Sequence, residues 1–216
     1  MSPFYDPVLP PLDEGEVLRY AGCKEADRAV LDLLSDCSQE ALEAVQKNAC
    51  YLTLPLEITG DTCNFGLFNL TSRDLAKALS DCEKAVVFAA TLGLGLDRLI
   101  LKYGRLSPAR ALMLQAIGAE RIETYCDLLS LHVSAEEGLF ATRRLSPGYG
   151  DLPLSAQKTL FAVLQCEKRL GLCLNDSLLM TPTKSVTAIF GLKKAPDCRE
   201  SKCSHCTKTD CSFRGA

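Results

Sequence analysis

The chain has 216 residues, of which 47% are hydrophobic and 24% charged, and its net charge is −3. This composition is typical of a globular protein and excludes a disordered chain, and the near-balanced charge argues against general nucleic-acid binding. No apolar run approaches the roughly 20 residues of a membrane span, and the start MSPFYDPVLPPLDEGE lacks the pattern of a signal peptide, so we expect a cytoplasmic protein.

The first quarter of the chain predicts two helices and then a pair of strands. KEADRAVLDLLSD (24–36) has apolar residues at helical spacing, and a second helix is expected to follow Ser38 as its N-cap. CYLTLPLEI (50–58) alternates like a strand, and CNFGLFNL (63–70) is its expected partner across a short turn. These elements predict a hairpin preceded by helices.

A buried strand is expected near the middle of the fold. SRDLAKALS (72–80) has a helical pattern and leads into KAVVFAATL (84–92), an apolar and β-branched run typical of a strand buried on both faces. GLGLDRLILKYG (93–104) then predicts a turn and a helix. Its glycines do not match a dinucleotide-binding loop, because Arg98 stands where the third glycine is required.

A long helix is expected to begin at Ser107 and Pro108, which combine an N-cap with a proline at the first helical position. The pattern extends to about His132 and ends before Gly138. LFATRRL (139–145) then predicts a strand. In the sequence, this helix therefore lies between the strands expected at 84–92 and 139–145.

The last elements are a helix and a strand. Ser155 is the expected cap of AQKTLFAVLQCEKRL (156–170), which Gly171 closes, and residues 186–190 are the final expected strand. Helices and strands mix without a regular βαβ alternation or repeat.

We therefore expect an α+β fold. It should be a single compact domain (1–195) of mixed helices and an antiparallel-rich sheet, followed by a short cysteine-rich tail (196–216).

The segment RRLSPGYGDLPLSAQ (143–157) is expected to be a shaped loop. Four residues exclude a helix or a central strand here: Pro147, Gly148, Gly150 and Pro153. A loop of this kind that carries Arg143, Arg144 and Tyr149 could hold an anionic ligand, or it could be a simple turn. The loop alone leaves both readings open.

Two segments together resemble one family. RRLSPGYGDLP (143–153) is similar to the Arg-x-x-Pro-Gly-Tyr loop of the activation domain of cobalamin-dependent methionine synthase. NDSLLMTPTKSVTAIFG (175–191) is similar to that family's Met-x-Pro-x-x-Ser-Val-Ser-Gly segment, and ATLG (90–93) and AIGAERIE (116–123) fit upstream. The resemblance spans roughly residues 50–191.

The resemblance implies a compact α+β fold and a role in restoring cobalamin. A domain of this family binds S-adenosylmethionine (AdoMet) and presents its methyl group to the cobalt of a corrinoid. Oxidised cob(II)alamin first receives one electron from a flavodoxin, a ferredoxin or a similar donor. The chain contains no corrinoid-carrying module of its own. It is therefore expected to act on a separate corrinoid protein such as methionine synthase, as part of a methyltransferase system and without turnover alone.

The resemblance also assigns roles in the loop. Arg144 aligns with the arginine that holds the AdoMet carboxylate, a task that suits a permanently charged, two-pronged guanidinium. Gly148, which follows Pro147, would let the backbone approach the ligand because it has no Cβ. Tyr149 would face the corrin or line the pocket.

Two further residues are assigned outside the loop. Ser185 would shape the floor of the site, and Glu120 would face the cationic part of the ligand. The chain departs from the family in two places, because Gly-Asp-Leu-Pro replaces the frequent Pro-Ala-Cys-Pro after the tyrosine, and a later stretch with another ligand-contacting tyrosine is missing.

The tail contains a cysteine motif with metal-ligand spacing. Its C-x4-C-x2-C-x4-C pattern consists of Cys198, Cys203, Cys206 and Cys211. Four thiolates at this spacing can bind zinc or an iron–sulfur cluster, and redox thiols or disulfides are the alternative. The other eight cysteines are scattered singly and are expected to be small buried hydrophobic residues kept reduced.

The tail supports two rival functions. The chain could be a metal-cluster redox activator of corrinoid proteins that does not use AdoMet, or a zinc-stabilised interaction module. The spacing of the cysteines does not decide between zinc and iron.

Overall fold

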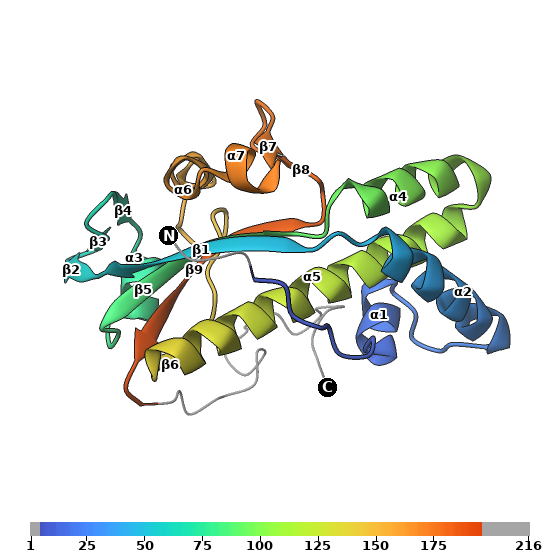
Figure 1. Cartoon of the computed structure of the whole chain (residues 1–216), viewed down its shortest axis with the longest axis horizontal. Helices are drawn as coiled ribbons and strands as arrows, with labels where there is room; N and C mark the ends of the chain where they lie inside the picture. Colours follow the sequence, from blue (N-terminus) through green and yellow to red (C-terminus); the bar gives the residue numbers. More distant parts are fainter. Residues whose placement is uncertain (1–4, 196–216) are drawn as a thin grey trace.

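A four-stranded antiparallel sheet runs through the middle of the molecule (Figure 1). The computed structural model describes residues 5–195. The strand order is β1 (Asn48–Pro55), β5 (Lys84–Thr91), β9 (Ser185–Lys193) and β6 (Phe140–Ala141). Seven of the eight residues of β5 are buried, as expected for an apolar strand between two layers.

The two faces of the sheet build two separate cores. Along β9, Phe190 packs with the layer that contains the long helix α5 (Pro108–Glu137), whereas Ile189 packs with the opposite layer. This alternation follows from the two-residue repeat of a strand. Any side chain on β9 can therefore be assigned to one face from its position.

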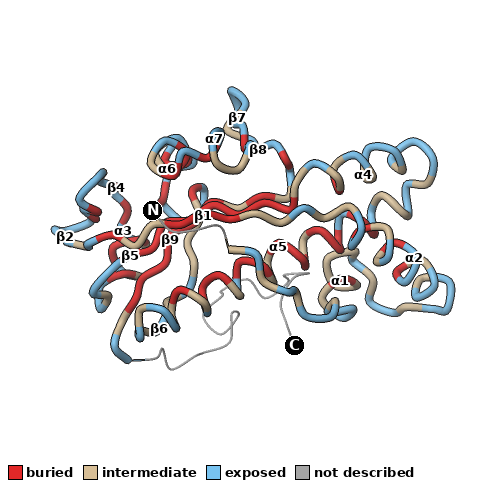
Figure 2. The backbone as a smooth tube through the Cα atoms, viewed as in Figure 1, coloured by how far each residue is buried: buried red, intermediate tan, exposed pale blue. Residues whose placement is uncertain are grey.

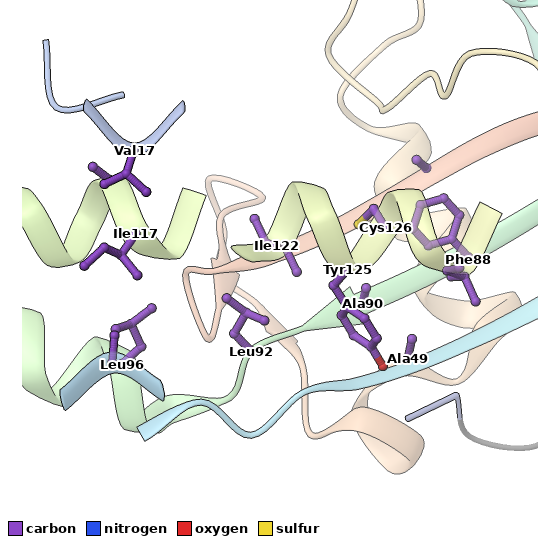
Figure 3. Packing of buried hydrophobic residues seen from close by; sticks show 14 of the residues in the cluster. Val17, Ala49, Phe88, Ala90, Leu92, Leu96, Ile117, Ile122, Tyr125 and Cys126 are labelled. Carbon is purple, nitrogen blue, oxygen red and sulfur yellow. The ribbon is translucent and has the colours of Figure 1, made fainter. Parts of the chain in front are cut away.

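The helix α5 has the ends that the sequence predicts. Ser107 precedes it, Pro108 occupies its first turn, and Gly138 ends it in the left-handed conformation with φ of 64°. The helix extends 30 residues along one face of the sheet and packs on it through residues such as Ile122 and Tyr125 (Figures 1 and 3).

Three helices surround the first half of α5: α1 (Glu14–Tyr20), α2 (Arg28–Ala44) and α4 (Leu94–Leu106). Val17 of α1 and Leu96 of α4 meet Ile117 from opposite sides (Figure 3). The prediction of two helices in residues 24–49 is wrong, because α2 is one helix capped by Asp27. Ser38 lies inside it, where its hydroxyl donates to the carbonyl oxygen of Leu34 at 2.7 Å.

The opposite face is covered by short elements: α3 (Arg73–Leu79), α6 (Ala156–Leu164), α7 (Cys166–Leu170), β2 (Glu57–Thr59), β3 (Thr62–Asn64), β4 (Asn69–Thr71), β7 (Cys173–Leu174) and β8 (Met180–Thr181). The predicted hairpin is present as β2 and β3, while β1 pairs instead with β5. The predicted helix over 156–170 is split because Gln165 adopts a left-handed backbone with φ of 53°. Figure 2 shows the buried residues concentrated along the sheet and the helix surfaces facing it.

The N-terminal leader lies against α5 and is held there by a buried ion pair. Arg121 donates to the carbonyl oxygen of Pro10 at 2.7 Å and to Glu120 at 2.6 Å. Tyr5 stacks on His132 with ring centroids 4.4 Å apart. The leader therefore packs on α5, the helix that α1, α2 and α4 also contact.

The architecture confirms the expected α+β class, with an antiparallel central sheet between helical layers in one compact arrangement. Among residues 5–195, no helix is both long and apolar enough to cross a membrane.

Candidate ligand site at the sheet edge

The segment that carries the two arginines is an edge strand before it becomes a loop. Leu145 exchanges two backbone hydrogen bonds with Ile189 of β9, each 2.8 Å long, and the N–H of Thr142 donates to the carbonyl oxygen of Gly191 at 2.8 Å. The backbone on both sides of Arg144 is thus fixed by the sheet. The predicted strand over 139–145 is present as the two-residue strand β6 and the separate backbone pairings of Thr142 and Leu145 with β9.

The Pro-Gly-Tyr turn that follows depends on its glycines. Gly148 and Gly150 have φ of 92° and 57°, a region that favours glycine. At Gly150 a Cβ would lie 2.2 Å from Oδ2 of Asp74. Pro147 is buried, whereas Tyr149 at the tip is 71% exposed. The turn therefore presents an aromatic ring to solvent from a constrained backbone.

Asp151 anchors the far end of the turn to helix α3. Its carboxylate accepts hydrogen bonds from the Ser72 hydroxyl at 2.5 Å and from the backbone N–H groups of Arg73 and Asp74 at 3.0 and 3.2 Å. These donors stabilise the ionised form, and the Ser72 hydroxyl foremost holds the pKa of Asp151 below its usual value. The loop is therefore tied to β9 at one end and to α3 at the other.

We expect this anchor to fail in acid. Because the folded-state pKa is lowered, the stabilisation is present above the usual aspartate pKa of about 3.9 and is lost as the pH falls through the folded-state value. The protection of the amides in residues 146–152 against hydrogen exchange, measured relative to the unstructured rate at the same pH, should therefore fall below about pH 4. An Asp151→Asn variant should show fast exchange at neutral pH as well, while Asp32→Asn on the exposed face of α2 should not. Equal protection in wild type and Asp151→Asn would show that the carboxylate does not hold the loop.

Arg144 lies between the edge strand and α5, where two carboxylates meet it. Its Nη2 is 2.8 Å from Oε2 of Glu123, and its Nη1 donates to Asp127 one turn further along the helix. The Arg144 side chain is only 16% exposed. Burial disfavours its charge, yet the two carboxylates beside it help to keep the pKa of Arg144 above its ordinary value.

Glu120 is on the same helix but does not join this cluster. Its side chain is 5% exposed and its carboxylate accepts from Arg121, from the Thr124 hydroxyl at 2.9 Å and from the N–H of Asp13 at 3.4 Å. These partners belong to α5 and the leader. The structure therefore places Glu120 in a buried structural ion pair.

Ser185 is also apart from Arg144. Val186 packs in the layer that contains α5, so the preceding Ser185 points to the opposite face of the sheet. Its hydroxyl lies 2.8 Å from both the Thr91 hydroxyl and the Pro182 carbonyl oxygen. Ile189, the partner of Leu145, is four residues away along β9, which corresponds to about 13 Å.

Comparison with known families decides what kind of domain this is. The sequence profile of the family described as "Vitamin B12 dependent methionine synthase, activation domain" matches residues 74–212. This chain belongs to that family. The resemblance noted in the sequence spans roughly residues 50–191. The family match begins later, at residue 74, and extends further, to residue 212, so it includes the four cysteines of the tail.

The fold of this activation-domain protein is also shared with a solved structure. It resembles the crystal structure of the MetH reactivation domain bound to AdoHcy, with a TM-score of 0.60 and 17% identity, over 82% of this chain and 69% of that one. No curated protein matches the sequence.

Four of the predicted residues lie in the edge strand and the turn that follows it: Arg144, Pro147, Gly148 and Tyr149. The structure adds two that the sequence analysis did not select, Glu123 and Asp127, which belong to the site through their contacts with Arg144. Their spacing of four residues on one helix was a signal that both face the same way.

The eight scattered cysteines of the activation-domain protein are free thiols. Five are buried as expected, namely Cys37, Cys50, Cys63, Cys126 and Cys166, while Cys173 is exposed. Burial raises the pKa of the Cys166 thiol to about 12, so it is not a thiolate at neutral pH.

The proposed metal ligands Cys198, Cys203, Cys206 and Cys211 lie outside the described residues. Within residues 5–195, no group of three or more His, Cys, Asp or Glu side chains could hold a metal ion.

Two hollows occur elsewhere on the described surface. One of about 440 Å³ lies beside α6 and α7 and is lined in part by Lys158, Phe161 and Leu174. The other, of about 260 Å³, lies between α2 and Arg110. Neither of these two is lined by a predicted site residue.

Proposed function

We propose that this protein binds AdoMet and serves the reductive methylation, and hence reactivation, of the cobalamin carried by a separate corrinoid methyltransferase such as methionine synthase. The observation that carries the proposal is the activation-domain match, which includes the Arg144 loop. AdoHcy, bound in the structurally similar MetH domain, supports a ligand of the same class here.

The residues of the loop fit the charged end of such a ligand. The backbone beside Arg144 is fixed by β9. A guanidinium has five N–H donors, so Arg144 can meet Glu123 and Asp127 and still offer N–H groups to a ligand carboxylate. Gly148 leaves the backbone open, since the nearest atom to an added Cβ would be a Leu154 methyl carbon at 3.4 Å. AdoMet would supply the methyl group, and Arg144 would hold its carboxylate.

Tyr149 is the proposed contact with the corrinoid partner. The residue is 71% exposed on the constrained turn, and an aromatic ring suits packing on a flat macrocycle. Ser185 would act through the backbone of β9 and not as a direct ligand, since its hydroxyl is engaged by Thr91 and Pro182. A one-electron donor such as a flavodoxin or ferredoxin completes the proposed system.

Calorimetric titration with AdoMet tests the proposal. Arg144→Ala should weaken binding about 10- to 100-fold, because one charge-assisted contact contributes roughly 1.5–3 kcal/mol. Arg144→Lys should weaken it less, because the charge remains while the fork is lost. The matched control is Arg143→Ala, which removes an exposed neighbour and should leave affinity unchanged. Failure of the folded wild-type protein to bind AdoMet would disprove this function.

The cysteine tail favours one alternative. Its spacing suits a zinc or iron–sulfur site, and a bound cluster could deliver the electron that reactivation requires. We propose metal binding by Cys198, Cys203, Cys206 and Cys211, with the tail (196–216) separate from the domain (1–195). Elemental analysis and the visible spectrum distinguish colourless zinc from an iron–sulfur cluster, and only the latter supports a redox activator that works without AdoMet.

A further inference from the structure

The Arg144 cluster carries an excess negative charge. Two carboxylates, Glu123 and Asp127, meet a single guanidinium, so the three side chains sum to −1. Within the described chain, neither carboxylate has an ion pair with another cation. The Glu123 and Asp127 side chains are 47% and 53% exposed, respectively, so both can be reached by a ligand, unlike Glu120.

If the carboxylate of a ligand binds Arg144, the other charged groups of that ligand lie near the excess negative charge of Glu123 and Asp127. In an amino-acid head group the ammonium is on the carbon next to the carboxylate, within reach of acids that flank the guanidinium. AdoMet carries one carboxylate, one ammonium and one sulfonium, for a net charge of +1. Loss of the methyl group leaves the bonding pair on sulfur as a neutral thioether, so the product AdoHcy has a net charge of zero.

We propose that Glu123 and Asp127 are specificity-determining residues that favour the cationic sulfonium ligand over its neutral thioether product. The proposal rests on the proposed function, because it takes AdoMet as the ligand of Arg144. The two carboxylates attract the sulfonium through space, and partial exposure limits the attraction to a modest factor. Because AdoHcy lacks the sulfonium charge, it is not held by this attraction and dissociates more readily than AdoMet.

Comparing three ligands distinguishes the effect of the ligand's charge on affinity from the effect of its methyl group. AdoMet and its amine analogue sinefungin both carry +1, whereas AdoHcy is neutral. Wild-type protein should bind the two cationic ligands about 3- to 10-fold more tightly than AdoHcy in low salt, and this ratio should shrink as salt screens the charges. In Glu123→Gln/Asp127→Asn the ratio should approach one.

The matched control is Asp32→Asn/Asp36→Asn, which also neutralises two exposed acids in ion pairs, both on α2. The partner of Asp36, Arg110, precedes Glu123 on α5 by 13 residues, or about 20 Å. This control should keep the wild-type ratio. Thermal unfolding checks that each variant is folded. Should the double variant not fold, the single variants and the salt dependence of the wild-type ratio give the same test.

The outcomes distinguish this inference from the proposed function. Equal weakening of all three ligands in the double variant would mean that the acids only position Arg144, and would overturn the specificity role. A wild-type ratio of one would also overturn it while leaving AdoMet binding intact. Absence of binding by every ligand to the wild type would remove the proposed function and this inference together.

Discussion

Replacing Arg121 with methionine should lower the free energy of unfolding by about 3–5 kcal/mol, because it leaves the Glu120 carboxylate buried without its counter-ion. The two side chains are 1% and 5% exposed, so little water can take the place of the lost guanidinium. The leader would also lose the donors that hold the carbonyl oxygens of Pro10 and Pro11. Urea-induced unfolding measures the loss.

Two controls separate this effect from a general loss of charge. Arg19→Met breaks the more exposed Arg19–Glu16 pair and should cost less than about 1 kcal/mol. Glu120→Gln/Arg121→Met removes both charges and should recover much of the loss, because no uncompensated ion remains. An Arg121→Met variant as stable as wild type would show that the ion pair is not a structural element of the fold.

The second large effect is expected from Phe88→Ala in the central strand. Phe88 is fully buried on the face of β5 that packs on α5 (Figure 3). Its ring centroid is 6.0 Å from that of Phe190. Truncation removes a large apolar side chain and leaves a cavity, which costs about 3–5 kcal/mol. Equilibrium urea unfolding followed by far-UV circular dichroism measures the difference.

Its matched comparisons are Phe88→Leu and Leu67→Ala. The first keeps most of the apolar volume and should cost much less than alanine, while the second truncates a side chain that is 66% exposed and should cost well under 1 kcal/mol. A small loss for Phe88→Ala would mean that the α5 layer can close over the cavity.

The sequence predicted helices and strands correctly where a local pattern was strong, such as an apolar run or a serine followed by a proline at a helix start. The central strand and the start of α5 at Ser107 and Pro108 are where they were expected. Ser38 misled the prediction because serine also tolerates a helix interior, where its hydroxyl bonds to the backbone one turn earlier. Gln165 gave no signal of a helix break, because its left-handed backbone with φ of 53° is uncommon for a residue other than glycine.

The site was predicted only where residues are contiguous in sequence. The loop motif selected Arg144 as a candidate site residue, but its partners on α5 come from a distant segment. Glu120 and Glu123 differ by three positions, which is a rotation of about 300° around a helix. That rotation gives Glu120 a buried partner in Arg121 and places Glu123 beside Arg144. Only the packing of the edge strand on α5 reveals the difference.

The family match begins at Asp74, but the folding unit does not. Strand β1 supplies one whole neighbour of β5, and Val17 and the leader cover α5. A recombinant fragment cut at the family boundary would leave the central strand with an open edge and the helix with an apolar flank in water. The boundary of the family match is therefore the wrong place to divide this protein for expression, and residues 5–73 act as an internal scaffold for the domain that the family profile recognises.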